Sequence, residues 1–329
     1  MNRPLLICLT PVLNEAWILP AFLRATSLWA DYIIIADQMS TDGSRDIYKQ
    51  FEKVIVIDNP REEMHQARTR KLLFDEAAKI KGDKILFTLD ADEFLSGDFI
   101  NTESWKTILN SVPNDVFLFR WMNLHENVEQ YTTWQHYYWA VHMSENTLEG
   151  QFPDNFIHEW RLPWPKNVNN EFKIDDISFI HFARVNYKRQ NNKERFYQIS
   201  TISKMKDYSG VGFYRQYHPI KDEEYFNLPE NVYDFYKKNN INLFNYINLD
   251  DIGNHYTTNV VNYISEFGIG KFAKLDVWDK DFLINNNLKD PRKWYHKLLH
   301  LYLRKTNKWQ KSFIVRIADK VIKRIEKMF

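Results

Sequence analysis

Four continuous apolar runs, separated by stretches with a helical pattern, constrain the fold of this chain more than any other feature. The runs lie at residues 5–9, 32–36, 53–57 and 84–89. Continuous rather than alternating runs are typical of parallel strands buried on both faces. The stretches between them predict crossover helices, of which the third, at about 62–81, ends at Gly82. The pattern therefore predicts an α/β fold with a mostly parallel sheet and helices on both of its faces.

Polar residues follow each of these runs. They are Thr10, Asn14 and Glu15 after the first, Asp37 and Gln38 after the second, Asp58 and Asn59 after the third, and Asp90 and Asp92 after the fourth. Ligands of an open parallel sheet bind beyond the carboxyl ends of its strands. Four polar strand ends together predict a metal-assisted nucleotide site at this edge.

The segment Leu89-Asp90-Ala91-Asp92-Glu93 places three carboxylates where the fourth run ends. Two acids spaced i, i+2 can hold a hard divalent cation through oxygen atoms and leave most of its coordination sphere for water and phosphates. The segment therefore predicts a diphosphate site.

Between about 117 and 182 the sequence changes to short strands rich in aromatic residues. The predicted strands lie at 117–121, 137–139, 160–162 and 177–181. Aromatic rings suit the C–H faces of sugars and their polar edges suit hydroxyls, although the same side chains can form a core. We expect this mixed half to bind an acceptor, and helical patches to follow after about 215.

The first 95 residues contain four motifs typical of one protein family. They are LTPVLNE at 9–15, ADQMSTDGS at 36–44, HQARTRK at 65–71 and LDADE at 89–93. In order and spacing they resemble the family 2 glycosyltransferases, which have the Rossmann-like GT-A fold. The chain is most similar to small soluble transferases that act on lipopolysaccharide, capsule or other surface glycans. It lacks the QxxRW motif of processive polysaccharide synthases.

The resemblance implies a set of residues that bind the nucleotide sugar. The segment from Thr10 to Glu15, with Pro11 and Asn14, would line the base, and Asp37 or its neighbour would contact uracil or ribose. The family commonly has a second acid where this chain has Gln38. The base is therefore left open between uridine, guanosine and thymidine, with a UDP-sugar favoured.

The resemblance also implies how the diphosphate is bound. Arg68 would face the nucleotide or its phosphates, the alternative being a helix-surface arginine. Asp90 and Ala91 would lie near the ribose, with Asp90 a second candidate for the metal. Asp92 would bind Mn²⁺ or Mg²⁺ between the two phosphates. A further metal ligand is expected from His181 or His158, although each can also be an ordinary core histidine.

Breaking the anomeric bond releases a nucleoside diphosphate, whose developing charge a divalent cation neutralises. An inverting mechanism also needs a carboxylate that deprotonates the acceptor hydroxyl. The candidates are Glu159, in a fragment that resembles the "HE" of related transferases, and Asp154. Glu93 is expected beside the metal ligands or on the acceptor side.

We therefore predict a metal-dependent, inverting glycosyltransferase of the hexosyltransferase type, active in surface polysaccharide biosynthesis. A second enzyme class, a Mg²⁺-dependent sugar-phosphate nucleotidyl- or phosphotransferase, can also use paired acids after a strand. However, the glycine-rich N-terminal loop of nucleotidyltransferases is missing, and Phe94 replaces the threonine of a DxDxT phosphatase. The third alternative is a non-catalytic glycan-binding protein of the same fold.

The net charge of +1 hides a strong asymmetry. Residues 292–329 contain 12 Lys and Arg but only 2 acids, a net charge of +10, and the rest of the chain is therefore at −9. Apolar residues at helical spacing within 313–329 predict a basic amphipathic helix, which either lies on an anionic membrane surface or packs on the catalytic domain. Nucleic acid is not an expected partner because the remainder is acidic.

The single cysteine, Cys8, fits a reducing compartment. No window approaches the roughly 18 uninterrupted apolar residues of a membrane span, so we expect a cytoplasmic protein, peripheral at the inner face of the cell membrane. The expected organisation has four parts. These are a nucleotide-binding half at 1–95 and an acceptor half at 96–215, which together form the catalytic domain 1–215, then a helical accessory region at 216–291 and a basic tail at 292–329.

Overall fold

The computed structural model describes residues 3–60, 66–144, 150–151, 161–218 and 224–326. The chain forms two compact units. The first contains residues 1–187 and 224–251, and the second contains 188–223 and 252–329. The chain thus leaves the first unit, returns to it and leaves again. The sequence-based division into a catalytic domain at 1–215, an accessory region at 216–291 and a tail at 292–329 remains a prediction.

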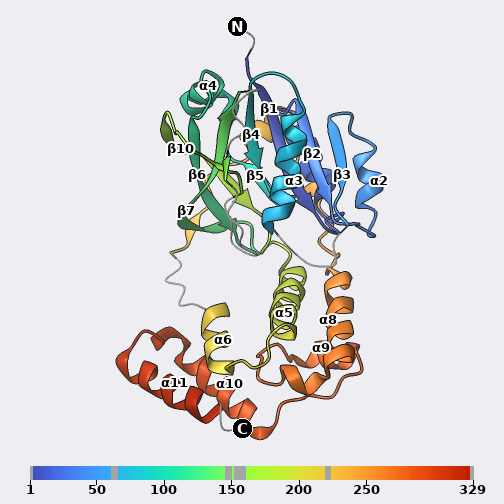
Figure 1. Ribbon diagram of the computed structural model, residues 1–329, viewed down its shortest axis with the longest axis vertical. Helices are drawn as coiled ribbons and strands as arrows, with labels where there is room; N and C mark the ends of the chain where they lie inside the picture. The colour runs from blue at the N-terminus through green and yellow to red at the C-terminus, as the bar shows by residue number, and fades with distance from the viewer. Residues whose placement is uncertain (1–2, 61–65, 145–149, 152–160, 219–223, 327–329) are drawn as a thin grey trace. The chain divides into compact units, whose positions relative to one another are not determined.

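A nine-stranded sheet forms the frame of the first unit, in the order β3-β2-β1-β4-β7-β6-β10-β5, with β11 beside β7 (Figure 1). Its strands are β1 (Leu5–Val12), β2 (Tyr32–Asp37), β3 (Val54–Asp58), β4 (Lys84–Thr88), β5 (Glu93–Leu95), β6 (Val116–Leu124), β7 (Gln130–Met143), β10 (Glu171–His181) and β11 (Phe226–Asn227). β8 (Gly150–Gln151) and β9 (Trp164–Pro165) pair separately.

The strands β3, β2, β1 and β4 pair in parallel, as the four apolar runs predict. In register, Val12 at the end of β1 lies opposite Asp37, and Asp37 lies opposite Asp58. The polar residues that follow these strands therefore meet at one edge of the sheet. The α/β fold class and the parallel part of the sheet are confirmed.

Helices cover both faces of this parallel part. Leu6 and Cys8 of β1 belong to the hydrophobic core that includes α1 (Leu19–Ser27), whereas Ile7 and Leu9 belong to the core beneath α3 (Gln66–Ala78). The predicted crossover helix at 62–81 corresponds to α3, which Figure 1 shows in front of the sheet. Burial on both faces explains the continuous runs of β1, β2 and β4, whereas β3, at the edge of the sheet, is partly exposed.

The other half of the sheet is mixed. β7 is antiparallel to β4 and β6, β6 is parallel to β10, and β10 is antiparallel to β5. The predicted strands 117–121 and 177–181 lie within β6 and β10. The strand predicted at 160–162 is wrong for its described residues, because Arg161 and Leu162 lie in a bend. Leu162 packs in the core beneath α3, and Arg161 bonds to acids at the strand ends.

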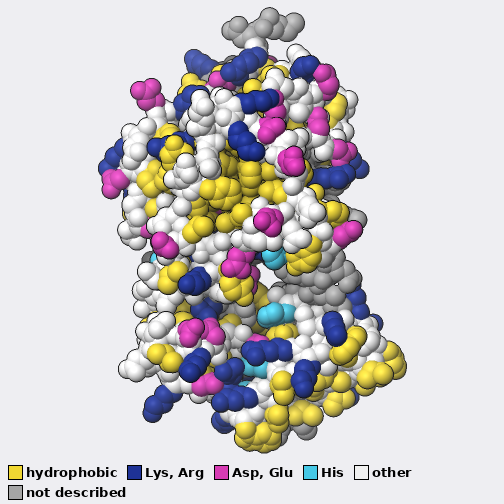
Figure 2. Space-filling model, turned by 180° about the vertical axis from the view of Figure 1, so that it is seen from behind, with side chains coloured by type: hydrophobic (Ala, Val, Ile, Leu, Met, Phe, Trp, Pro, Cys, Tyr) yellow, Lys and Arg dark blue, Asp and Glu magenta, His cyan; other side chains and the backbone are white. Residues whose placement is uncertain are grey.

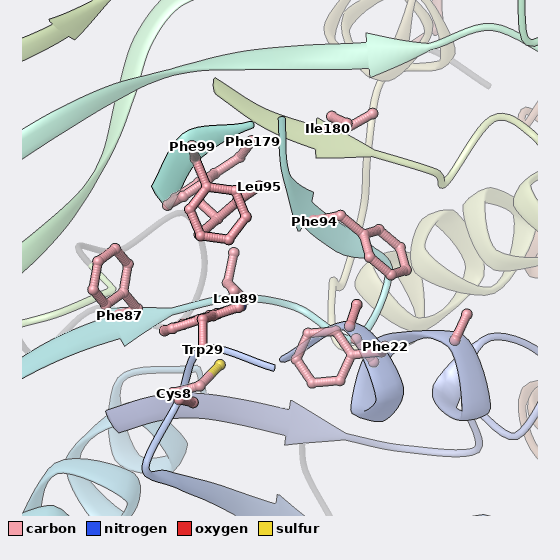
Figure 3. Close-up of a cluster of buried hydrophobic side chains, with 14 of the residues drawn as sticks. Cys8, Phe22, Trp29, Phe87, Leu89, Phe94, Leu95, Phe99, Phe179 and Ile180 are labelled. Atoms are coloured by element: carbon pink, nitrogen blue, oxygen red, sulfur yellow. The ribbon is translucent and has the colours of Figure 1, made fainter. Parts of the chain in front are cut away.

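The larger core is rich in aromatic side chains, which include Phe22 of α1, Phe87 of β4, Phe94 of β5 and Phe179 of β10 (Figure 3). Phe87 is fully buried in this core, with its ring centroid 5.1 Å from that of Trp29 and 5.7 Å from that of Trp105. Burial raises the pKa of the Cys8 thiol to about 12. Cys8 therefore stays protonated and acts as a small apolar side chain.

The remaining helices of the first unit are short: α2 (Ser44–Tyr48), η1 (Phe99–Asn101), α4 (Glu103–Leu109), α7 (Asp234–Lys238) and η2 (Leu243–Tyr246). The second unit is helical and contains α5 (Tyr187–Ser203), α6 (Gly210–Tyr217), α8 (Asn254–Phe267), η3 (Ile269–Phe272), α9 (Lys280–Asn285), α10 (Trp294–Thr306), η4 (Asn307–Trp309) and α11 (Phe313–Glu326). Helices were expected only after about residue 215, so α5 lies within the part expected to be the mixed acceptor half. Among the helices so described, none is long and apolar enough to cross a bilayer.

Replacing Phe87 by alanine should lower the free energy of unfolding of the first unit by about 3–5 kcal/mol, because it leaves a cavity between two tryptophans. The measurement is urea denaturation followed by tryptophan fluorescence. Val112→Ala is the control, since this side chain is 50% exposed and its truncation should cost no more than about 0.5 kcal/mol. Equal losses for the two variants would contradict this packing.

Candidate functional site

Hydrogen bonds join the turns that follow β1 and β2. Asn14 has a φ of 55°, a left-handed conformation that asparagine tolerates. Its backbone N–H donates to Ser40 Oγ at 2.9 Å, and its side-chain oxygen accepts from the Thr41 N–H at 2.7 Å. Ala16 N–H donates to Asp42 Oδ2 at 2.8 Å. The segment predicted to line the base, Thr10 to Glu15, therefore has a fixed shape.

Asp37 is fully buried, and its carboxylate shapes this edge. It accepts hydrogen bonds from the Ser40 N–H at 2.9 Å, from Tyr48 Oη at 2.7 Å and from Arg45 Nη1 at 3.2 Å. Burial and the Asp37 carboxylate raise the pKa of the Tyr48 phenol. Gln38 beside it is partly exposed. Of the two residues predicted to contact the nucleotide, Gln38 is thus the one with accessible surface.

The arginine of α3 that reaches the end of β4 is Arg70. Its Nη2 donates to Asp90 Oδ1 at 2.8 Å, and its side chain is only 8% exposed. Burial lowers the pKa of Arg70, and the Asp90 carboxylate opposes that effect. Arg68, the predicted residue, is exposed on α3, and its role remains a prediction. Arg70 could have been found from helical spacing, because it precedes the buried Leu73 and Ala77 by three and seven residues.

Arg161 joins two of the three acids of the Asp90–Glu93 segment. Its Nη2 donates to Asp90 Oδ2 at 2.8 Å and to Glu93 Oε1 at 2.9 Å, and its Nη1 bonds to Glu93 Oε2. Glu93 is fully buried and also accepts from the Asp90 N–H at 2.8 Å. Burial raises the pKa of Glu93, and Arg161 opposes that effect. No sequence signal singled out Arg161.

Asp92 and His181 lie together on the neighbouring strand ends. Asp92 Oδ2 is 3.5 Å from His181 Nε2, and the backbone oxygen of Asp92 accepts from the Phe182 N–H at 2.9 Å. His181 Nδ1 is 2.9 Å from Asn123 Oδ1. An amide oxygen only accepts, so Nδ1 is the donor in this contact and Nε2 is the ring nitrogen that faces Asp92. The antiparallel pairing of β5 with β10 produces this approach.

These two side chains fit a divalent cation. One carboxylate and one imidazole leave positions for water and phosphate oxygens, as is usual for Mg²⁺ and Mn²⁺ beside a nucleotide. Over the parts of the chain that the structure describes, no group of three metal-ligating residues occurs. Asp90 faces Arg70 and Arg161, and a cation bound to Asp90 would compete with both. Its role as a metal ligand remains a prediction.

The two candidates for the catalytic base, Asp154 and Glu159, lie outside the described residues, as does His158.

Ala91, which lies between Asp90 and Asp92 in the sequence, is buried. Thr10 is fully buried, whereas Pro11 and Glu15 are partly exposed beside the Asn14 turn. The structure thus places the predicted strand-end residues at one edge of the parallel strands.

Residues 8–102 match the family model described as glycosyl transferase family 2. This match is consistent with a family 2 glycosyltransferase-type domain in this part of the chain. The matched residues contain the strands β2 to β5, most of β1, and both acids of the Asp90-Ala91-Asp92 segment. His181 and Arg161 lie beyond the matched residues, in the half where the sequence resemblance fades.

Two solved structures show a weaker similarity. One is 4-diphosphocytidyl-2C-methyl-D-erythritol synthase, with 12% identity over 28% of this chain and 48% of that chain, and a TM-score of 0.24. The other is the inositol-1-phosphate CTP transferase from T. maritima, with 8% identity over 55% of this chain and 90% of that chain, and a TM-score of 0.34. The chain thus spans about half the length of the first. No curated protein matches it.

Arg161→Gln should lower the free energy of unfolding by about 3–5 kcal/mol, because it leaves the buried Glu93 carboxylate without its partner. Arg120→Gln is the matched control. Arg120 bonds to Asp175 at 2.7 Å with both side chains more than half exposed, so its loss should cost about 0–1 kcal/mol. Denaturation of both variants by urea measures the difference. Similar losses would show that Glu93 does not depend on Arg161.

Proposed function

We propose that this protein is a metal-dependent, inverting glycosyltransferase that moves a hexose from a nucleotide-diphosphate sugar to a hydroxyl of a glycan or glycolipid. The observation that carries the proposal is the pairing of Asp92 with His181 at the carboxyl edge of a family 2 domain. Asp92 belongs to the family motif, and His181 comes from a strand that is distant in the sequence but adjacent in the sheet. The two side chains approach each other at the edge where a diphosphate would bind.

In this proposal Asp92 and His181 hold Mn²⁺ or Mg²⁺, which when bound neutralises the charge of the leaving diphosphate. Asn123 fixes the tautomer of His181 so that Nε2 stays available as a ligand. Trp121, whose ring centroid lies 4.4 Å from that of His181, limits how the imidazole can turn. The protein thus orients the histidine before the donor binds.

The arginine pair at the end of β4 supports the donor site electrostatically. Arg70 and Arg161 each donate to one oxygen of Asp90, and in our proposal these two bonds orient the carboxylate toward the ribose. Gln38 and the turn at Asn14 would contact the base, with a UDP-sugar favoured. Glu159 or Asp154 would deprotonate the acceptor hydroxyl.

The acceptor in this proposal is a glycan or a lipid-linked glycan of surface polysaccharide biosynthesis, and the reaction takes place in the cytoplasm at the inner face of the cell membrane. The rival class, a sugar-phosphate nucleotidyltransferase, makes a nucleotide sugar instead of consuming one. Incubation with CTP or UTP, a hexose 1-phosphate and Mg²⁺ separates the two classes. Formation of a nucleotide sugar there would contradict the proposal.

Asp92→Asn should reduce metal-dependent hydrolysis or transfer from the nucleotide sugar by at least about 100-fold, because the amide loses the negative charge that attracts the cation. His181→Gln should also weaken Mn²⁺ affinity. Asp175→Asn, an exposed acid of the same strand as His181, is the control and should leave both quantities unchanged. Titration of Mn²⁺ into the nucleotide complex measures the affinities. Unchanged turnover in Asp92→Asn would sink the proposal.

A thermal-shift screen of UDP-, GDP- and dTDP-sugars, each with and without Mn²⁺, should identify the base. We expect one nucleotide to raise the melting temperature only when metal is present, since the cation links its phosphates to Asp92. Gln38→Ala should lower the affinity of the protein for that nucleotide. It should not change the affinity for Mn²⁺ measured without nucleotide. Equal shifts for all three nucleotides would contradict a specific base contact.

A further inference from the structure

The C-terminal helices expose an unusual number of large apolar side chains. On α11 and the turn before it these are Trp309, Phe313, Ile314, Ile317, Val321 and Ile325, which we name the C-terminal surface. Phe313 and Ile314 are 78% and 79% exposed. Figure 2 shows apolar side chains gathered over these helices. The helix α10 adds a second exposed stripe at Trp294, Leu298 and Leu301.

The opposite side of α11 holds the helix within its own unit. Asp319 accepts hydrogen bonds from Arg215 at 3.0 Å and from Tyr302 at 2.8 Å. Glu326 accepts from Ser209 Oγ at 2.5 Å and from the Gly210 N–H at 2.9 Å, at the N-terminus of α6. Because these bonds fix the rotation of α11, the predicted apolar stripe faces outward.

The exposed charged side chains on α10 and α11 themselves are basic. Asp319 and Glu326 are the only acids between 292 and 329, and both are used in the bonds that hold α11. Two exposed basic residues of α10 pair with acids of the preceding segment, Lys297 with Asp290 at 3.3 Å and Arg304 with Asp276 at 2.6 Å. The other exposed basic residues of this region are Lys293, Lys305, Lys308, Lys311, Arg316, Lys320 and Arg324. The exposed surface of α10 and α11 is therefore apolar and cationic.

We propose that the C-terminal surface binds an anionic lipid bilayer, with its apolar side chains inserted among the acyl chains and its lysines and arginines on the headgroup phosphates. An apolar stripe flanked by basic residues has the chemistry of an interfacial helix. Trp309 and the long basic side chains suit the boundary between headgroups and water. A second copy of this chain fits poorly, since pairing this face with itself brings like charges together. The inference goes beyond the transfer reaction and does not depend on it.

The test is flotation of the whole protein with vesicles of phosphatidylcholine alone and of phosphatidylcholine with an equal amount of phosphatidylglycerol. We expect binding to the anionic vesicles that weakens as salt increases. The pair Lys311→Gln and Arg316→Gln should lower the partition coefficient roughly 30-fold, from the contribution of each basic residue near the headgroups. The pair Phe313→Ser and Ile314→Ser should lower it at least about tenfold. The matched controls on α9, Lys280→Gln and Ile284→Ser, should leave it unchanged.

Absence of flotation with anionic vesicles, equal binding to both vesicle types, or unchanged binding by the two pairs would overturn the inference. So would a dimer in sedimentation velocity that Phe313→Ser and Ile314→Ser dissociates, because the surface would then be a protein interface. Nucleotide-dependent thermal shifts of the same variants should equal that of the unmodified protein. Loss of lipid binding and loss of donor binding are therefore measured separately.

Discussion

The site depends on the burial of Glu93 beside Arg161. A carboxylate with no exposed surface requires compensating charge, and Arg161 supplies it with two hydrogen bonds while also reaching Asp90. The Asp90 N–H donates to the same carboxylate. The turn between β4 and β5 is therefore held at Asp90 and at Glu93. This turn sets the position of Asp92 against His181.

The frame around this turn could be predicted from the sequence because β1, β2 and β4 are buried on both faces and β3 at the edge keeps the same apolar run. Burial on two sides requires continuous apolar residues, and the four runs of that kind became β1 to β4. Their parallel pairing brings the polar strand ends to one edge, and the predicted partnership of Asp92 with His181 appears there as a contact of 3.5 Å. Local periodicity was sufficient for the strands, whereas the expectation that His181 accompanies Asp92 came from the family resemblance.

Contacts between distant segments could not be predicted in this way. Arg161 is 68 residues from Glu93, and the predicted strand around it does not form at the described residues. Residues 224–251 return to the first unit, where Tyr236 Oη donates to the Leu95 oxygen at 2.8 Å. No local pattern in the sequence predicted this return. For α11 the pattern predicted the helix, whereas its exposed face was decided by the bonds of Asp319 and Glu326 to other helices of its unit.

The central claim is that Asp92 and His181 together hold the metal that binds the donor diphosphate. Crystals grown with Mn²⁺ and UDP test it most directly, through anomalous scattering recorded at the manganese edge. The account predicts one strong peak within coordination distance of Asp92 Oδ2 and His181 Nε2, in contact with both phosphates. A manganese ion held by other residues, with Asp92 and His181 remote from the diphosphate, would contradict it.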